Sequence, residues 1–291
     1  MSDHHSLHTL ANVLVVLFVV SNILAMGMTL TVREIVAPLR DRLLVMKALV
    51  ANFVLVPLLA YVLVQVTHLE RGLAIGLILV ATAAGDAFML KLSEIAKASM
   101  AFTLGLLVLL NVASVIYMPI VVPLLLRGVT VDPISIAKSL VLLMLIPLVV
   151  GLCVRATFEK IARMFAGPLD RMSSVVIAVA GSLILYLNFD QILATWGSHA
   201  ILCTLILAPA SFAFGYFMVS SPPEIRSALG LGTGQRNGTA ALVIAVRNFP
   251  ANYSVVVMIV IFIGIGSLVI LTTLAVFCRR ANVPEVAARK L

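Results

Sequence analysis

Apolar runs of about twenty residues follow one another along almost the whole chain, separated by loops of a few residues. A run of this length is sufficient to cross a hydrocarbon core of ~30 Å as an α-helix. The runs are continuous rather than alternating, which favours helices over a transmembrane barrel. With 62% hydrophobic and 11% charged residues, the chain has too little polar surface to cover a soluble globule. We therefore expect an all-α polytopic membrane protein.

Nine candidate spans emerge when windows of about nineteen residues are compared with the helix breakers that flank them. They cover residues 9–31, 42–66, 70–97, 100–126, 133–156, 173–193, 198–220, 224–248 and 252–278. The loops between them leave no room for a second soluble domain, so residues 1–291 are predicted to form a single membrane domain. No small-residue cleavage pattern follows the first run, which we expect to remain as a helix rather than to act as a signal peptide.

The Lys and Arg residues give a net charge of +8, but they are scattered in short loops and form no dense basic stripe. We therefore expect no nucleic-acid partner. Alternate connections carry most of these residues and belong in the cytoplasm by the positive-inside rule; they hold Arg33, Arg40, Arg42, Lys97, Arg155, Lys160, Arg163, Arg171, Arg226, Arg279, Arg280, Arg289 and Lys290. The pattern predicts an inner-membrane protein with its N-terminus outside and its C-terminus in the cytoplasm. The three cysteines have no spacing typical of disulfides or of a metal site.

Two of the nine spans contain polar and charged residues at a depth where a lipid-facing helix would be apolar. The third is broken near residues 84–88, at Ala84-Gly85-Asp86, and the eighth is broken near residues 232–238, at Gln235-Arg236-Asn237. Unwound backbone within a membrane is tolerated only where it is buried in protein or lines a watery cavity, so both breaks mark a candidate site. Broken helices third from the start and second from the end are typical of transporters built from inverted repeats.

Short motifs in both halves of the chain match a known family. They are Gly27-Met28-Thr29-Leu30-Thr31 before a charged turn, Asn52-Phe53 with Pro57, Leu77-Ile78-Leu79-Val80 before the first break, and Gly234 with Asn237 in the second. These motifs resemble the bile acid:sodium symporter family. The resemblance implies nine helices in two inverted repeats, arranged as a panel and a core in which the broken helices cross. It also implies transport of bile salts or other organic anions, with two sodium ions bound beside the crossing.

The chain departs from that family where the resemblance implies sodium ligands. The family's Ser-Asn pair is replaced by Met89-Leu90, and its Glu and Gln ligands align with Gly232 and Arg236. A thioether and a hydrocarbon cannot replace oxygen ligands for a hard cation. We therefore expect no metal site and no cofactor, with sodium doubtful.

Arg236 carries the functional hypothesis. Arginine keeps its proton in proteins, so near mid-membrane it is a fixed positive charge that needs an anionic partner. We interpret it as a built-in cation that replaces a sodium ion and allows sodium-independent binding of a small organic anion. It is expected to line the site, with Asp86 as its partner across the crossing. A proton-coupling role for Asp86 remains an alternative.

Other polar side chains are candidates for binding substrate or ion, and each has a structural alternative. Gln235, Asn237 and Thr239 offer donors and acceptors beside the second break, but they could equally satisfy freed backbone groups. Asn52 and Thr103 align with family sodium ligands, and both could equally form interhelical hydrogen bonds.

Residues at the first break complete the candidate site. Lys91 and Glu94 are three apart on one helix face, so a local ion pair is the first interpretation, with Lys91 as a second sodium substitute as the alternative. Gly85 and Gly234 belong to the set because they lie within the two breaks.

Competing functional classes find little support in the chain. An intramembrane aspartyl protease needs a second carboxylate able to share a proton with Asp86, and Glu94 lies beside a Lys. No Ser-His pair, zinc motif or phosphate-binding loop appears, so no enzyme is predicted. We expect a monomeric secondary transporter of small organic anions that works by alternating access in the lipid bilayer. A sodium- or proton-coupled symporter, a passive channel and a non-transporting binding protein remain alternatives.

Overall fold

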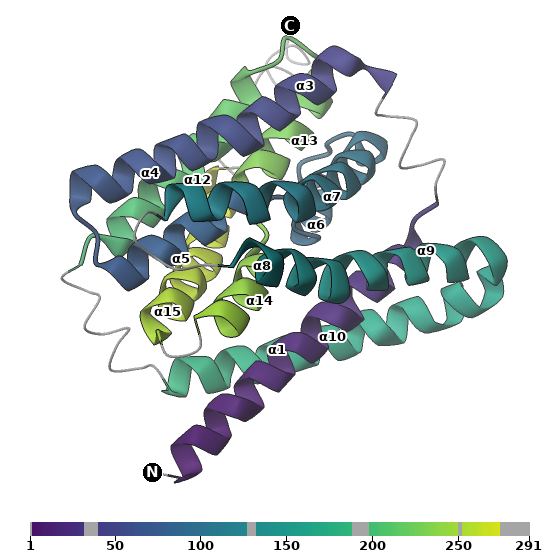
Figure 1. The fold of residues 1–291 in the computed structure, drawn as a ribbon. Coiled ribbons are helices and arrows are strands. Elements are labelled where there is room, and N and C mark those ends of the chain that lie inside the picture. The colour runs from purple at the N-terminus through teal and green to yellow at the C-terminus, as the bar shows by residue number, and fades with distance from the viewer. Residues whose placement is uncertain (1, 32–39, 127–131, 188–197, 250–251, 274–291) are drawn as a thin grey trace, which may run out of the picture.

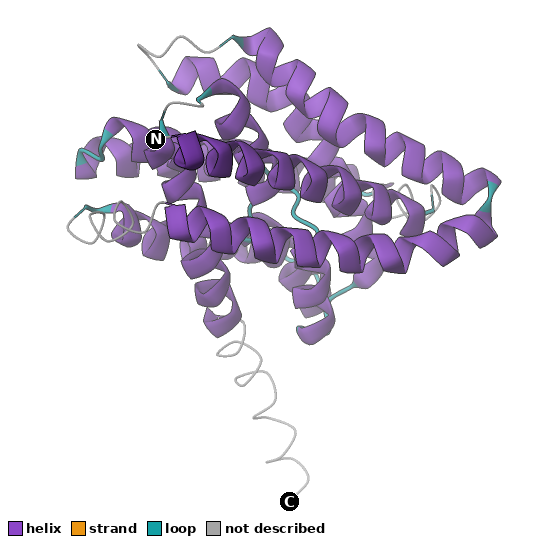
Figure 2. Cartoon of the chain, turned by 90° about the horizontal axis from the view of Figure 1, so that it is seen from below, coloured by secondary structure: helices purple, strands orange, loops and turns teal. Residues whose placement is uncertain are grey.

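The computed structural model describes residues 2–31, 40–126, 132–187, 198–249 and 252–273. Helices make up nearly all of this part of the chain, and it contains no strand (Figure 2). In chain order the elements are α1 (Ser2–Thr29), α3 (Arg42–Val50), η2 (Ala51–Leu55), α4 (Val56–Thr67), α5 (Arg71–Thr82), α6 (Phe88–Ile95), α7 (Met100–Leu125), α8 (Pro133–Leu140), η3 (Val141–Leu145), α9 (Ile146–Thr157), α10 (Glu159–Leu187), α12 (Ala200–Phe217), α13 (Pro223–Gly234), α14 (Gly238–Asn248), α15 (Tyr253–Ile261) and η5 (Phe262–Gly266). The prediction of an all-α chain is confirmed.

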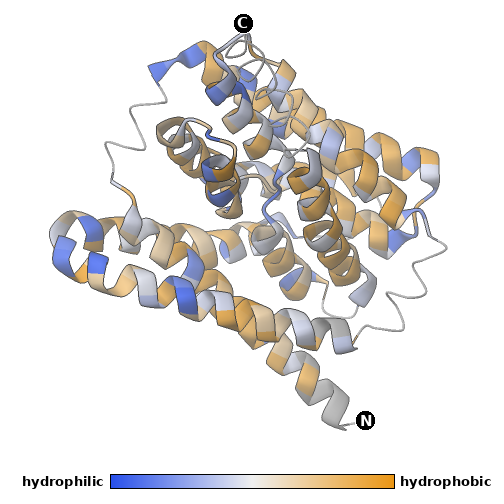
Figure 3. Ribbon diagram, turned by 180° about the vertical axis from the view of Figure 1, so that it is seen from behind, coloured by the Kyte–Doolittle hydropathy of each residue, from blue (hydrophilic) through white to orange (hydrophobic). Residues whose placement is uncertain are grey.

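Six helical segments among the described residues are long and apolar enough to cross a membrane. They are Thr9–Thr29, Arg42–Thr67, Met100–Leu125, Pro133–Thr157, Ala200–Phe217 and Tyr253–Thr273. Figure 3 shows hydrophobic residues along most of the helical ribbon, as expected for a polytopic membrane protein. The two interrupted helices, α5 with α6 and α13 with α14, and the amphipathic α10 fall outside this group because they are broken or carry charges.

Helix α10 differs from its prediction. The predicted span begins at residue 173, whereas the helix begins at Glu159. Within α10, Glu159 accepts from Arg163 one turn later, a spacing that favours the helix. Glu159 also pairs at 3.3 Å with Arg155, near the end of α9. The predicted end at residue 193 lies outside the described residues.

The helices form two groups. Helices α1, α9 and α10 pack together in one layer, which we call the small layer, and they lie side by side along the lower part of Figure 1. The remaining helices surround α5, α13 and α14 and form the large layer. The small layer contacts the large layer through α1 and α14, so the second broken helix lies at the boundary between them.

A π-helical turn positions one of the candidate site residues. The η2 turn precedes Pro57, which has no N–H to donate back along the helix. The Phe53 carbonyl instead accepts from the Tyr117 hydroxyl of α7. Such wide turns occur frequently at functional sites, and this one includes Asn52, which is buried and faces the second break.

Glycines allow α1 and α9 to approach closely within the small layer. A Cβ added at Gly27 would lie 2.6 Å from the Leu148 carbonyl oxygen and 3.0 Å from the Gly151 Cα. Both neighbours are backbone atoms and cannot turn aside. Small residues of this kind allow close helix packing in membranes, where lipid tails offer no hydrophobic alternative. The crossing of α1 and α9 therefore depends on these two glycines.

We predict that Gly27→Ala separates α1 from α9 and lowers the free energy of unfolding by about 1–3 kcal/mol, because the added methyl overpacks a backbone contact. Gly181→Ala on α10 is the matched control, since its Cβ would meet nothing within 4 Å and alanine favours helices. Thermal unfolding of the purified protein measures both. Equal midpoints for the two variants would contradict the close-packing argument.

Candidate functional site

The two interrupted helices cross at their breaks. Helix α5 ends at Thr82 and α6 begins at Phe88, while α13 ends at Gly234 and α14 begins at Gly238. Ala84 and Arg236 form an isolated antiparallel bridge, and the Asn237 N–H donates to the Ala83 carbonyl at 3.0 Å. The breaks therefore satisfy part of each other's backbone, as unwound segments in a membrane must.

Helix α7 braces the crossing from the side. The Ser114 hydroxyl accepts from the Ala84 N–H at 3.0 Å and donates to the Ala84 carbonyl at 3.1 Å. The Asn111 amide donates to the Gly85 carbonyl at 2.7 Å. The Asn237 amide donates to the same carbonyl at 2.9 Å and to the Asn111 side-chain oxygen at 3.0 Å. Three helices are thus tied together at one point.

Gly85 is required by both its conformation and its surroundings. Its φ is +86°, in the region that side-chain-bearing residues rarely adopt. An added Cβ would lie 2.8 Å from the Asn111 backbone nitrogen. The first break can therefore approach α7 only with glycine at this position.

The guanidinium of Arg236 is buried, with the residue 2% exposed, and oxygen atoms enclose it. Nη1 donates to the Asn52 side-chain oxygen at 2.8 Å, and Nη2 donates to the Ala81 carbonyl at 2.6 Å. Longer hydrogen bonds of 3.4 Å reach the carbonyl oxygens of Val80, Asn52 and Thr233. These acceptors are all neutral, so carbonyl dipoles rather than a carboxylate stabilise the charge.

The predicted pairing of Arg236 with Asp86 is wrong. The Asp86 carboxylate instead accepts from the Phe88 N–H at 2.7 Å and faces the Gly238 N–H. The sequence places both charges at the breaks, but it does not show the direction in which each side chain leaves the backbone.

The helix ends at the crossing are matched to these two charges. Carbonyl groups in the last turns of α5 and α13 point at Arg236, and such C-terminal ends carry partial negative charge. The first amide of α6 donates to Asp86, and the first amide of α14, which donates to the Arg236 carbonyl at 2.9 Å, also faces the Asp86 carboxylate; such N-terminal ends carry partial positive charge. The chain thus supplies its own cation and its own anion to the four helix ends.

A cavity of about 520 Å³ opens between the two layers beside the breaks. The small layer contributes Phe18, Asn22, Asp170, Ser173, Ser174 and Ile177 to its walls. The large layer contributes Asp86, Ala87, Phe88, Lys91, Gln235, Gly238, Thr239, Leu242, Ile263 and Ser267. The volume is in the range of small-molecule sites, and the walls mix apolar side chains with hydroxyl, amide and charged groups.

The profile of the Sodium Bile acid symporter family matches residues 15–195, which is more than half of the chain. The chain belongs to this family. It is 26% identical over 256 residues to the chloroplastic probable sodium/metabolite cotransporter BASS3 of Arabidopsis thaliana, covering 84% of this chain and 59% of that protein. It is 25% identical over 278 residues to the corresponding BASS2 protein of Oryza sativa subsp. japonica, covering 90% of this chain and 62% of that protein.

A third relative, the chloroplastic probable sodium/metabolite cotransporter BASS1 of Arabidopsis thaliana, is 25% identical over 234 residues, covering 78% of this chain and 57% of that protein. The chain therefore spans less than two thirds of the length of each of these three relatives. The family consists of transporters and not of enzymes, which agrees with the prediction from sequence.

The predicted site residues of this family member divide into groups. Asp86, Lys91, Gln235 and Thr239 line the cavity. Gly85 and Asn237 hold the crossing together, and Arg236 with Asn52 forms the buried oxygen-lined cluster behind it. Gly234 packs against Phe212 of α12, and Thr103 donates to Ser93 and to the Ser99 carbonyl. Contrary to expectation, Arg236 is absent from the cavity walls.

Lys91 forms the predicted local ion pair. Its ammonium lies 3.7 Å from the Glu94 carboxylate, and both side chains are exposed. An exposed pair of this kind contributes little to stability, so Lys91 remains able to contact a ligand in the cavity.

The two positions that the resemblance assigns to sodium have different surroundings in this chain. A Cβ at Gly232 would lie 2.7 Å from Leu106 Cδ2 and 2.9 Å from Met89 Cε, so apolar atoms fill that position. Met89 is fully buried. At the other position the guanidinium of Arg236 occupies the space between Asn52 and the helix carbonyls.

Several site residues were not predicted. Asn111 and Ser114 were visible as polar residues in an apolar span, but only the structure shows that they brace the break. Asn22 and Ser267 have the same weak signal. The sequence pattern predicts a loop at Asp170, because its apolar part begins only at residue 173, whereas α10 begins at Glu159.

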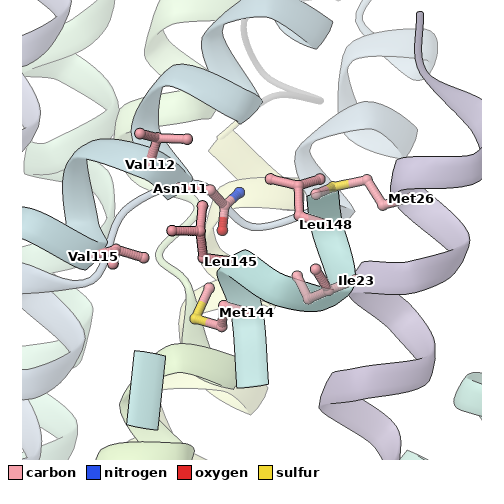
Figure 4. Close-up of a pocket in the computed structure, with 8 residues that line it drawn as sticks. All are labelled: Ile23, Met26, Asn111, Val112, Val115, Met144, Leu145 and Leu148. Atoms are coloured by element: carbon pink, nitrogen blue, oxygen red, sulfur yellow. The ribbon is translucent and has the colours of Figure 1, made fainter. Parts of the chain in front are cut away.

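A second, much smaller cavity of about 10 Å³ lies at the boundary between the layers, and Figure 4 shows the side chains around it. Ile23 and Met26 of α1 and Met144, Leu145 and Leu148 of the α8–η3–α9 helix face Asn111, Val112 and Val115 of α7. It has room for about one water molecule. The Asn111 amide is already bonded to Gly85, so we interpret this space as a packing gap. Among the described residues, no group of three metal-ligating side chains occurs.

We predict that Asn237→Asp destabilises the protein by about 3 kcal/mol or more. The carboxylate still accepts from the Ala240 N–H but can no longer donate to Gly85 or Asn111, and a buried charge would face a carbonyl. Asn248→Asp is the control, because the Asn248 amide makes one local bond, to Ile244 at the end of α14. Thermal unfolding compares them. If Asn237→Asp lowers the stability by no more than the control does, the crossing does not depend on the Asn237 amide.

Proposed function

We propose that this chain is a secondary transporter that moves small organic anions by alternating access without the family's two sodium ions. Membership of a transporter family supports the general class. The observation that carries the sodium-independent part is the burial of the Arg236 guanidinium among five neutral oxygen acceptors at the helix crossing.

The surroundings of Arg236 are those expected of a cation site. A hard cation in a protein takes carbonyl and carboxamide oxygens as ligands, and those are the acceptors around this guanidinium. A permanently charged side chain there supplies the positive charge that the C-terminal ends of α5 and α13 require. Sodium is then not needed to hold these two helices together.

The other family position also argues against sodium. Met89 and Leu106 present carbon atoms toward Gly232, and the hydroxyl of Thr103 donates to Ser93 and to the Ser99 carbonyl. Such a donor set lacks the oxygen atoms that a hard cation requires. The relatives are named as sodium/metabolite cotransporters, so this chain would differ from them in its coupling.

The cavity between the layers is the proposed substrate site. Its donors are the ammonium of Lys91, the amides of Asn22 and Gln235, and hydroxyls such as that of Thr239. These groups suit a carboxylate or other oxyanion of small size. Because the walls come from both layers, a displacement of one layer against the other would open the cavity to one side of the membrane and close it to the other.

The finer architecture belongs to the same proposal. We infer nine spans in two inverted repeats, with the interrupted helices third and eighth, because the breaks cross in antiparallel fashion and inverted repeats place their discontinuous helices in this way. The charges where α9 ends and α10 begins, including Arg155 and Arg163, favour a cytoplasmic position for that junction. The proposed setting is an inner membrane, with the N-terminus outside, the C-terminus inside and the chain as a monomer.

Uptake of labelled organic anions into proteoliposomes tests the proposal. We expect saturable uptake and counterflow of a small carboxylate at the same rate in sodium and in choline salts, because no sodium ligand set remains. Uptake that occurs only in sodium would refute sodium independence, and unitary currents without counterflow would indicate a channel instead.

We further predict that Arg236→Gln lowers the stability by about 3 kcal/mol in choline, because buried carbonyl groups lose their donor. The glutamine oxygen and the freed carbonyls form a better ligand set for sodium, so sodium should restore part of the melting temperature in this variant alone. Arg163→Gln is the control, since that guanidinium is exposed on α10. A wild-type protein whose melting temperature itself rises in sodium would contradict the built-in cation.

A further inference from the structure

The charges that line the large cavity are predominantly negative. Asp86 from the first break and Asp170 from α10 lie in its walls, and Lys91 is the one cationic side chain among the described lining residues. Lys91 also has its own acidic neighbour in Glu94, at 3.7 Å. The guanidinium of Arg236 is bonded to carbonyl groups away from the cavity walls. A substrate that carries only negative charge would therefore meet two carboxylates and one ammonium along these walls.

Asp86 strengthens this conclusion through its position. The amides at the starts of α6 and α14 would otherwise be the natural place for a substrate carboxylate. The Asp86 carboxylate already accepts from the Phe88 N–H and faces the Gly238 N–H. A substrate anion cannot use these helix ends while Asp86 covers them, and the covered ends present negative charge to the cavity.

We infer that the substrate is a zwitterion, with an ammonium or similar cationic group that binds near Asp86 and Asp170 and an anionic group that binds near Lys91. The inference rests on the proposed transport function, and it adds to the anionic group of the proposed substrate a cationic group on the same molecule. Opposite charges at the two ends of the substrate match the opposite charges on the walls. The cavity of about 520 Å³ has room for a molecule with both groups.

Matched compounds separate the charge classes. We would measure thermal stabilisation of the full-length purified protein by two sets: 4-aminobutyrate, butyrate and butylamine, and then phenylalanine, 3-phenylpropanoate and 2-phenylethylamine. The members of each set differ chiefly in which charged groups they carry. We expect at least one zwitterion to bind about tenfold more tightly than both its anionic and its cationic partner.

The possible outcomes distinguish this inference from the proposed function. Equal or tighter binding of the anion overturns the zwitterion inference and leaves the organic-anion proposal in place. Binding of the amines alone overturns both. Failure of both zwitterions to bind overturns the inference.

Charge-neutralising variants provide an independent test. Asp86→Asn keeps a side-chain oxygen that can accept from the Phe88 N–H before α6, but it removes the negative charge. We expect the preference for the zwitterion over the anion to fall about tenfold. Asp170→Asn, at an exposed position of α10, should also lower the preference for the zwitterion. It replaces the first variant in the test if Asp86→Asn does not fold.

Asp132→Asn is the matched control. Like Asp86, Asp132 accepts from backbone amides at the start of a helix, here those of Ile134 and Ser135 in α8, but it does not line the cavity. An unchanged preference in both Asp86→Asn and Asp170→Asn, or an equal change in Asp132→Asn, would overturn the assigned role of the cavity carboxylates.

Discussion

The crossing of two interrupted helices is the constraint on which the rest of the structure depends. Four helix ends meet within the large layer, and each end exposes unsatisfied backbone groups of one polarity. In this chain Arg236 donates to carbonyl groups at the C-terminal ends, the Asp86 carboxylate accepts from the first amide of α6, and the Asn237 side chain accepts from an amide of α14. Neither charged side chain requires the other as an ion-pair partner, because the dipoles of the helix ends stabilise each of them. This explains why two opposite charges can both lie at the crossing of the breaks and yet form no ion pair.

A covalently attached cation has a consequence for energy coupling. A sodium ion can enter and leave its site, and its gradient can therefore drive a substrate. A guanidinium bonded to the Ala81 and Asn52 oxygens stays with the protein throughout the cycle. If Arg236 replaces sodium as proposed, the crossing is stabilised permanently, but a sodium gradient can no longer drive transport of the substrate. Transport would then follow the gradient of the substrate itself or of a second ligand that shares the cavity.

The sequence was sufficient for the helical class, the positions of both breaks and the choice of Arg236 as the central charge, because hydropathy and helix breakers report depth in the membrane. It was insufficient for the direction of side chains, so it paired Arg236 with Asp86 and placed Arg236 in the cavity wall. The bracing by Asn111 and Ser114 depends on which face of α7 meets the break. Asp170 was missed because charged residues can continue a helix beyond its apolar part when they pair at helical spacing, as Glu159 and Arg163 do.

The parts of the molecule that are held by hydrogen bonds differ from the parts that can move against each other. The hydrogen bonds of the crossing come from α5, α7, α13, α14 and the η2 turn, which all belong to the large layer. The walls of the large cavity come from both layers, and the small cavity beside Asn111 shows that apolar side chains, two of them Met26 and Met144, fill part of the boundary. Apolar contacts have no directional preference, and methionine adapts its shape readily. A shift of α1 and α10 can therefore change the access to the cavity while the bonds around Arg236 and Asn237 remain intact.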